Sequence, residues 1–128
     1  MRASVVGVLV LVAACSQSPT APTIPIGQDV VLSPGQTATI EGASIALRFD
    51  DVRGDVRCPP GFSCIQGGNA TVDISVLADE GATRYELQTA NTVPGRHGDL
   101  TITLVDLRPF PFGTPQGEEY RATFRVTR

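Results

Sequence analysis

The residues with the most chemical potential in this chain are its three cysteines, Cys15, Cys58 and Cys64. A cysteine thiol can carry a lipid, ligate a metal ion or close a disulfide, and the local sequence separates these uses. Cys58 and Cys64 enclose the run Pro-Pro-Gly-Phe-Ser, whose composition favours a tight turn. This pair is therefore a candidate for a disulfide, with a two-thiol metal site as the alternative.

Cys15 ends an apolar run that follows a short basic start at Arg2. The run from Val5 to Ala14 is shorter than the roughly 20 residues that a membrane-spanning helix needs. Its small residues before the thiol resemble a bacterial lipoprotein signal peptide with its lipobox. We expect residues 1–14 to be cleaved and the sulfur of Cys15 to carry lipid; the alternative is a buried N-terminal helix or strand. Ser16 is compatible with an outer-membrane anchor facing the periplasm.

Export of the chain would also decide the chemistry of the other two cysteines. Lipidation of Cys15 removes the odd thiol and leaves Cys58 and Cys64 in a compartment where disulfides form. Zinc sites usually take four ligands at shorter pair spacings, and the chain has no fourth cysteine. The sequence therefore favours a Cys58–Cys64 disulfide over a metal site.

The loop closed by this disulfide is the best candidate for recognition. It would present Arg57, Pro59, Pro60 and Phe62 on a turn stiffened much as protease-inhibitor loops are. A rigid loop loses less entropy when it binds. This interpretation requires Arg57 and Phe62 to be exposed. The alternative is that the disulfide only secures a long connection between two strands.

Asp50, Asp51 and Asp55 form a weak candidate for calcium, which takes six to eight oxygen ligands. Their spacing does not match an EF-hand loop, which needs alternating acidic positions and a later glutamate. The alternative is that Asp51 or Asp55 caps a turn or pairs with Arg53 or Arg57. We expect no metal and no cofactor.

The sequence contains no convincing catalytic constellation. His97 is the only histidine and lies in a Gly-rich segment, where we expect a solvated loop residue. Nucleophilic catalysis needs a nucleophile beside a base, and neither Ser63 nor Ser75 lies in a Gly-x-Ser-x-Gly turn. Asp73 and Glu86 are expected on outward strand faces, whereas glycosidase chemistry needs two inward carboxylates. We expect a protein that is not an enzyme.

Composition sets the domain organisation and excludes one class of partner. The formal charge is −3 at pH 7, and the arginines are scattered. Nucleic acid is therefore not expected as a partner, because phosphate binding needs a basic patch. Residues 15–26 form a Pro/Ser/Thr-rich tether, and residues 27–128 form one domain.

The domain alternates apolar and polar residues with a period of two, which is typical of β-strands that have one buried face. The pattern breaks after Leu104 and continues with Val105 and Leu107 inward, which indicates a bulge or a strand that changes sheets. Phe110 and Phe112 lie in a Pro-rich segment that either covers an open end of the core or is exposed. The expected strands are 29–32, 37–40, 44–52, 70–77, 83–88, 100–107 and 119–127. These predict an all-β fold: an antiparallel, immunoglobulin-like sandwich of about seven short strands with a disulfide-clipped loop.

The stretch from Asp55 to Ala70 is the most individual part of the chain, with its Asp-Val-Arg-Cys-Pro-Pro start and a second cysteine six positions on. It resembles a family of small secreted bacterial lipoproteins of unknown function. The likeness extends to an early Pro-Gly-Gln turn and a final Tyr-x-Ala-x-Phe strand. Val56 replaces the serine and Gln66 the tryptophan that the family usually carries. The resemblance implies a compact β-domain with a clipped loop and brings no activity.

These observations lead to one functional interpretation and one alternative. The first is a lipid-anchored protein of the bacterial cell envelope, held to the membrane through Cys15 and acting as a binding or structural module. The alternative is an inhibitor or chaperone-like module that offers the Cys58–Cys64 loop to an envelope or secreted partner.

Overall fold

The computed structural model describes residues 21–91, 93–111 and 119–128, and this part of the chain is all-β without a helix. Each of the seven expected strands is present within about two residues of its predicted bounds. Two further strands, β1 and β7, are short. In chain order the strands are β1 (Thr23–Ile24), β2 (Asp29–Leu32), β3 (Thr37–Ile40), β4 (Ala46–Arg53), β5 (Thr71–Ala78), β6 (Gly81–Gln88), β7 (Gly95–His97), β8 (Leu100–Arg108) and β9 (Arg121–Thr127).

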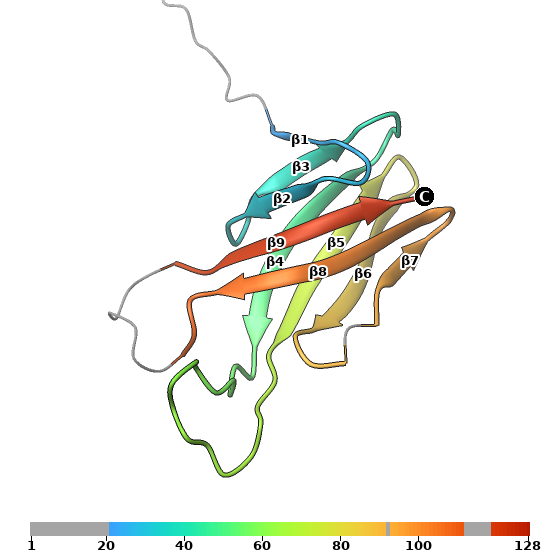
Figure 1. The fold of residues 1–128 in the computed structure, drawn as a ribbon. Helices are drawn as coiled ribbons and strands as arrows, with labels where there is room; N and C mark the ends of the chain where they lie inside the picture. The colour runs from blue at the N-terminus through green and yellow to red at the C-terminus, as the bar shows by residue number, and fades with distance from the viewer. Residues whose placement is uncertain (1–20, 92, 112–118) are drawn as a thin grey trace, which may run out of the picture.

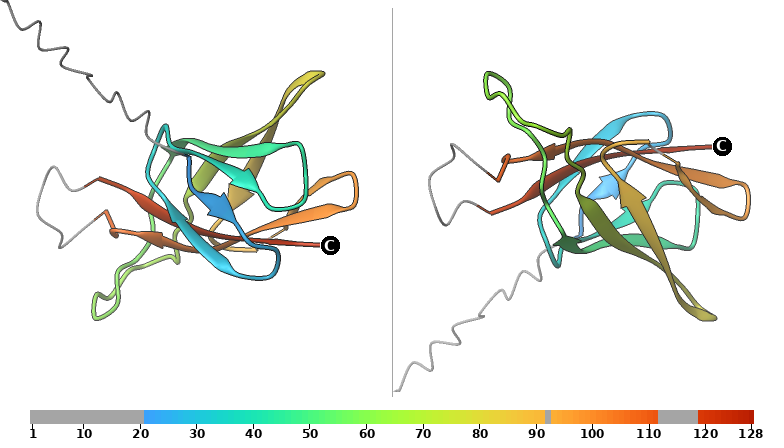
Figure 2. Two further views of the ribbon diagram at one scale, coloured as in Figure 1. Left: turned by 90° about the horizontal axis from the view of Figure 1, so that it is seen from above. Right: turned by 90° about the horizontal axis from the view of Figure 1, so that it is seen from below.

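The strands form two sheets (Figure 1). The five-stranded sheet has the order β1-β3-β4-β5-β6, and the four-stranded sheet has the order β2-β9-β8-β7. All pairings between described strands are antiparallel except that of β1 with β3, which is parallel and departs from the antiparallel arrangement expected. The β5–β6 hairpin reaches out beyond the body of the molecule (Figure 2).

One hydrophobic cluster draws side chains from both sheets. Phe49 of β4 and Phe124 of β9 meet edge to face, with ring centroids 5.9 Å apart. Both rings are completely buried, so this contact joins the two sheets across the core. Strands β4, β5, β8 and β9 together supply most of the cluster through one face of each strand.

Ile24 shows where sequence reasoning placed the start of the domain too late. The segment 15–26 was expected to be a tether, yet Ile24 lies in β1 and is completely buried in the core. An isolated apolar residue between prolines gives no alternation to detect. Only its pairing with Ile40 of β3 makes it a strand residue. Residues 1–20 of the predicted signal peptide and tether, Cys15 included, lie outside the described residues, as does Phe112.

The predicted irregularity in β8 is confirmed. The register between β8 and β9 shifts between Leu104 and Asp106, as a bulge requires. The predicted faces are corrected at one position: Leu107 is buried, but Val105 is 44% exposed. Val105 is the residue that the shift leaves without a partner on β9, so its side chain lies outside the core. No helix within residues 21–91, 93–111 and 119–128 is long and apolar enough to cross a membrane.

Candidate functional site

The connection between β4 and β5, residues 54–70, is closed by the predicted disulfide. Cys58 and Cys64 are bonded, with their Cα atoms 6.0 Å apart. At the base of the loop the Val56 N–H donates to the carbonyl oxygen of Asn69 at 3.0 Å. A Cβ built on Gly68 would lie 1.5 Å from the Val56 carbonyl oxygen, so only glycine fits there. The two arms of the loop are therefore in direct backbone contact below the disulfide.

The tight turn expected inside the disulfide is also present. The Phe62 N–H donates to the Pro59 carbonyl oxygen at 3.2 Å. Pro60 and Gly61 occupy the two central positions, and Gly61 has a φ of 85°. Proline followed by a residue with positive φ is the signature of a type II turn. The disulfide and this turn together restrict the conformations of the loop.

Two members of the predicted recognition set, Pro59 and Arg57, are buried and not available to a partner. Arg57 is the one whose exposure the prediction required. It was expected to protrude, but it is only 6% exposed. Its Nε and Nη2 donate to the two carboxylate oxygens of Asp55, each at 2.8 Å. Nη1 donates to the Leu107 carbonyl oxygen, and Nη2 donates to that of Pro109 at 2.6 Å. Arg57 therefore ties the loop to the end of β8 and is not available to a partner.

Two aromatic side chains complete the surroundings of this ion pair. The guanidinium carbon of Arg57 lies 4.6 Å from the centroid of the Phe110 ring. Tyr120 donates its hydroxyl proton to Asp55 at 2.8 Å. Phe110 and Tyr120 flank the segment that joins β8 to β9, so this cluster gathers residues from three parts of the chain.

The cluster shifts the ionisation of its members. Burial alone raises the pKa of Asp55, but the hydrogen bonds from Arg57 and Tyr120 outweigh it and hold that pKa below its ordinary value. Burial and the hydrogen bond to Asp55 raise the pKa of Tyr120 to about 12. Asp55 is thus a carboxylate and Tyr120 a neutral phenol at neutral pH. Neither group is poised to exchange a proton there.

The tip of the loop, residues 60–65, is exposed, in contrast to the buried cluster around Arg57. Phe62 is 56% exposed and Ile65 is fully exposed, while Pro60 is exposed and Pro59 is buried. Two large apolar side chains thus face solvent on one constrained loop. The exposure expected of Phe62 is confirmed, and Ile65 adds an apolar residue that the sequence analysis did not single out.

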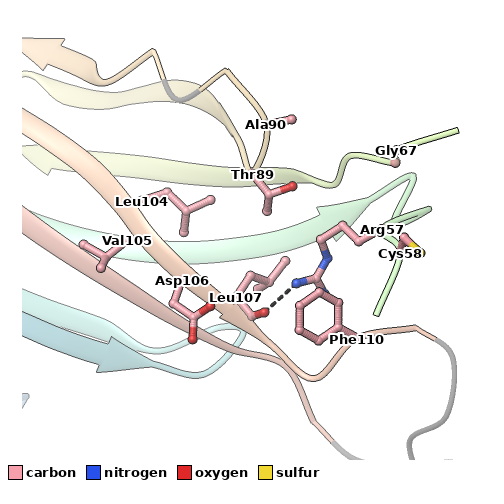
Figure 3. A pocket seen from close by; sticks show the side chains of 11 residues that line it. Arg57, Cys58, Gly67, Thr89, Ala90, Leu104, Val105, Asp106, Leu107 and Phe110 are labelled. Carbon is pink, nitrogen blue, oxygen red and sulfur yellow. Dashed lines mark hydrogen bonds between the residues drawn. The ribbon is translucent and has the colours of Figure 1, made fainter. Parts of the chain in front are cut away.

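A pocket of about 330 Å³ lies between the base of this loop and β8 (Figure 3). It is lined by Arg57, Cys58, Thr89, Leu104, Leu107 and Phe110, among others. The Arg57 guanidinium points towards the Leu107 carbonyl group at one end of the pocket (Figure 3). The lining is mainly apolar, and its two charged residues, Arg57 and Asp106, each have an ion-pair partner within the protein.

The three weak calcium candidates do not converge. Asp50 accepts hydrogen bonds from Arg48 at 2.6 Å and from Ser75. Asp51 caps the next backbone N–H, that of Val52, and Asp55 pairs with Arg57. Each carboxylate therefore has a partner of its own. The geometry supports the alternative in which Asp51 caps a backbone N–H and Asp55 pairs with Arg57. Among the described residues, no three His, Cys, Asp or Glu side chains form a group that could hold a metal ion.

The structure adds to one expectation about the enzymatic candidates and corrects another. Asp73 lies on the outward face with Glu86, but it is only 4% exposed because Arg53 of the neighbouring strand covers it, with Nε–Oδ2 and Nη2–Oδ1 distances of 2.6 and 2.9 Å. His97 lies in β7 and not in a loop. Its Nδ1 is 2.9 Å from the hydroxyl oxygen of Tyr85.

Sequence reasoning missed the role of Tyr120 and of the carbonyl groups of Leu107 and Pro109. Among the alternatives left open for Asp51 and Asp55, the pairing of Asp55 with Arg57 was the only part of this cluster that the sequence indicated. The contacts of this pair with Leu107, Pro109 and Tyr120 involve residues fifty or more positions away, and no local pattern predicts such contacts.

No known protein-family model, curated protein or solved structure matches this chain.

Proposed function

We propose that this chain is a lipid-anchored protein of the bacterial cell envelope that binds a partner through the apolar tip of its disulfide loop. In this proposal it resembles the small secreted lipoproteins with the Asp-x-Arg-Cys-Pro loop, its two sheets form an immunoglobulin-like sandwich, and it performs no catalysis. Anchoring through Cys15 in the outer membrane would place the domain in the periplasm.

One observation carries the binding role: Phe62 and Ile65 are exposed on a loop that is fixed at its tip and at its base. Exposed apolar side chains cost solubility, and grouped ones mark contact sites. The disulfide, the type II turn and the Arg57–Asp55 pair restrict the loop before any partner arrives. Binding then loses little conformational entropy, which favours affinity.

The inhibitor or chaperone-like alternative uses the same loop, but only one of the two side chains that it requires, Phe62, is exposed. It relied on both Arg57 and Phe62 to reach a partner, and Arg57 is turned inward. What remains for it is the apolar segment from Phe62 to Ile65. A partner would therefore present a hydrophobic surface and not an acidic pocket for an arginine.

The membrane half of the proposal is tested by mass spectrometry of the mature N-terminal peptide. We expect a chain that begins at Cys15 and carries acyl groups on it, because two or more chains are needed for stable anchoring. A chain that begins at Met1 with a free thiol at Cys15 would refute the anchor. The fold of the described domain does not depend on this result, whereas a chain kept in a reducing compartment would be expected to lose the Cys58–Cys64 disulfide.

The binding half is tested by affinity purification from envelope extracts with two matched double variants. Phe62→Ser/Ile65→Ser removes the apolar tip, and Val31→Ser/Val93→Ser removes two other exposed apolar residues. We expect the first to lose the partners that the wild-type chain retains and the second to keep them. Equal retention by both variants, each with an unchanged melting temperature, would refute the role of the tip.

A further inference from the structure

Strand β6 is an eight-residue edge of the five-stranded sheet, and it is paired on one side only. Its first four residues, Gly81–Arg84, are all exposed, and the β5–β6 hairpin extends past the rest of the molecule (Figure 2). Long exposed edges are templates for pairing with another strand. The question is whether the side chains on β6 prevent such pairing or direct it.

The hairpin fixes which backbone groups of β6 are free. Ala78 pairs with Gly81 across a two-residue turn, so these two residues exchange backbone hydrogen bonds. Bonded and non-bonded pairs alternate along an antiparallel ladder, and the register from Ala78–Gly81 to Thr71–Gln88 has no shift. The odd-numbered residues of β6 therefore bond to β5. The N–H and C=O groups of residues 82, 84, 86 and 88 point away from the sheet.

The charges on the outer face of β6 single out one partner strand, namely β6 of a second copy. Arg84 and Glu86 are both exposed and have opposite charges. If two β6 strands pair antiparallel with Tyr85 facing Tyr85, Arg84 of each copy lies opposite Glu86 of the other. In the same register, Arg84 of one copy and Glu86 of the other form a pair that exchanges two backbone hydrogen bonds. The backbone groups of residues 84 and 86 are among those that point away from the sheet, so they are available for these bonds. A shift of two residues in either direction would pair Arg84 with Arg84 or Glu86 with Glu86.

Existing ion pairs on the same face strengthen this complementarity. Glu86 already accepts a hydrogen bond from Nη2 of Arg53 at 2.6 Å, and Arg53 also covers Asp73. Arg84 lies opposite Ser75 on β5 and has no ion pair within residues 21–91, 93–111 and 119–128. In the paired arrangement each unpaired Arg84 gains a carboxylate that is already held in position.

We propose that two copies of this chain form a symmetric dimer by antiparallel pairing of β6 with β6, centred on Tyr85, with reciprocal Arg84–Glu86 contacts. This surface lies on the sheet edge and does not involve the disulfide loop, so the dimer does not depend on the binding role of Phe62 and Ile65. The arrangement is a closed two-fold contact, in which each copy contributes its β6 edge once.

The test is a charge exchange followed by sedimentation equilibrium of the purified full-length chain in a neutral detergent. Arg84→Glu and Glu86→Arg each place like charges opposite one another twice, which opposes pairing. We expect each to raise the dimer dissociation constant at least about tenfold. The double variant Arg84→Glu/Glu86→Arg restores opposite charges across the contact but not the Arg53–Glu86 pair, and it is expected to bind more tightly than either single variant. Circular dichroism melts of all four proteins report whether the monomers remain folded.

A second variant tests the register without touching the charges. Ala82→Cys/Gln88→Cys places cysteines at facing positions of the two copies, about 5.5 Å apart between Cα atoms, within disulfide range. We expect this double variant to form a covalent dimer on oxidation, and neither single variant nor the wild-type chain to do so. A wild-type chain that stays monomeric, a charge exchange that rescues nothing, or cross-linking by the single variants to the same extent would overturn the proposal.

Discussion

Arg57 has a different role in the structure from the one that its sequence neighbours indicate. Beside a disulfide and two prolines it has the composition of a recognition loop. In the structure its guanidinium group bonds to the Asp55 carboxylate and to two carbonyl groups, and it lies over the Phe110 ring. A charge removed from water needs such partners, and Arg57 finds them inside the protein.

The first prediction concerns this buried pair. Arg57→Ala would leave the Asp55 carboxylate buried without its cation, which costs about 3–5 kcal/mol of unfolding free energy. The matched control is Arg108→Ala, which breaks the exposed ion pair with Asp106 and should cost at most about 1 kcal/mol. Urea unfolding of both variants measures the difference. Equal losses would mean that the Arg57 cluster does not hold the loop.

The second prediction concerns Tyr120, whose pKa is raised to about 12 in the folded protein. The phenol is ordinarily at 10, so folding favours its protonated form. Its contribution, about 1 kcal/mol for one such hydrogen bond, is complete below pH 10 and disappears as the pH rises through 12. The difference in unfolding free energy between the wild-type chain and Tyr120→Phe should therefore narrow across that range. A difference that stays constant up to pH 12 would contradict the assigned hydrogen bond.

At the scale of elements, the close contact between the arms of the disulfide loop gives a third prediction. Gly68→Ala would drive a methyl group into the Val56 carbonyl oxygen, and the forced backbone shift should cost about 1–3 kcal/mol. Gly67→Ala is the control, because a Cβ there meets nothing within 4 Å. It should be neutral or slightly stabilising. Thermal melts decide between them, and equal melting temperatures would contradict the contact at Val56.

The strands were predictable to the extent that each carried its own alternating pattern. Period-two segments located seven strands, and the broken pattern after Leu104 located the bulge. β1 and β7 were not predicted, because a strand of two or three residues is too short to show a period. Ile24 of β1 is buried only because neighbouring strands cover it. The burial of Asp73 was not predictable for a related reason: alternation assigns its face correctly, but it does not reveal that Arg53 covers that face.

The candidate site was predictable only where it is local in sequence. The disulfide, the turn at Pro60–Gly61 and the Asp55–Arg57 pairing each lie within a few residues. The attachment of the loop to Leu107, Pro109 and Tyr120 joins segments that the fold alone brings together. Exposure of Ile65 likewise depends on how the loop projects from the strands.

At the scale of the whole molecule, its possible contact regions are spatially separate. β1, by which the described chain enters the domain, and the disulfide loop lie at opposite ends of the molecule (Figure 1). The free edge of β6 belongs to the hairpin that projects elsewhere (Figure 2). An anchor, a partner and a second copy would therefore not compete for the same residues. We expect variants of the loop tip and of β6 to act independently.

The claim that the loop tip meets a partner is tested most directly by photo-cross-linking in intact cells. A photoreactive phenylalanine analogue placed at Phe62 or Ile65 should trap one and the same protein, because both side chains are exposed on the tip. The analogue at Val31 or Val93, which are also exposed, should not trap it. Cross-links that are absent at the tip, or that form equally well at all four positions, would contradict the account.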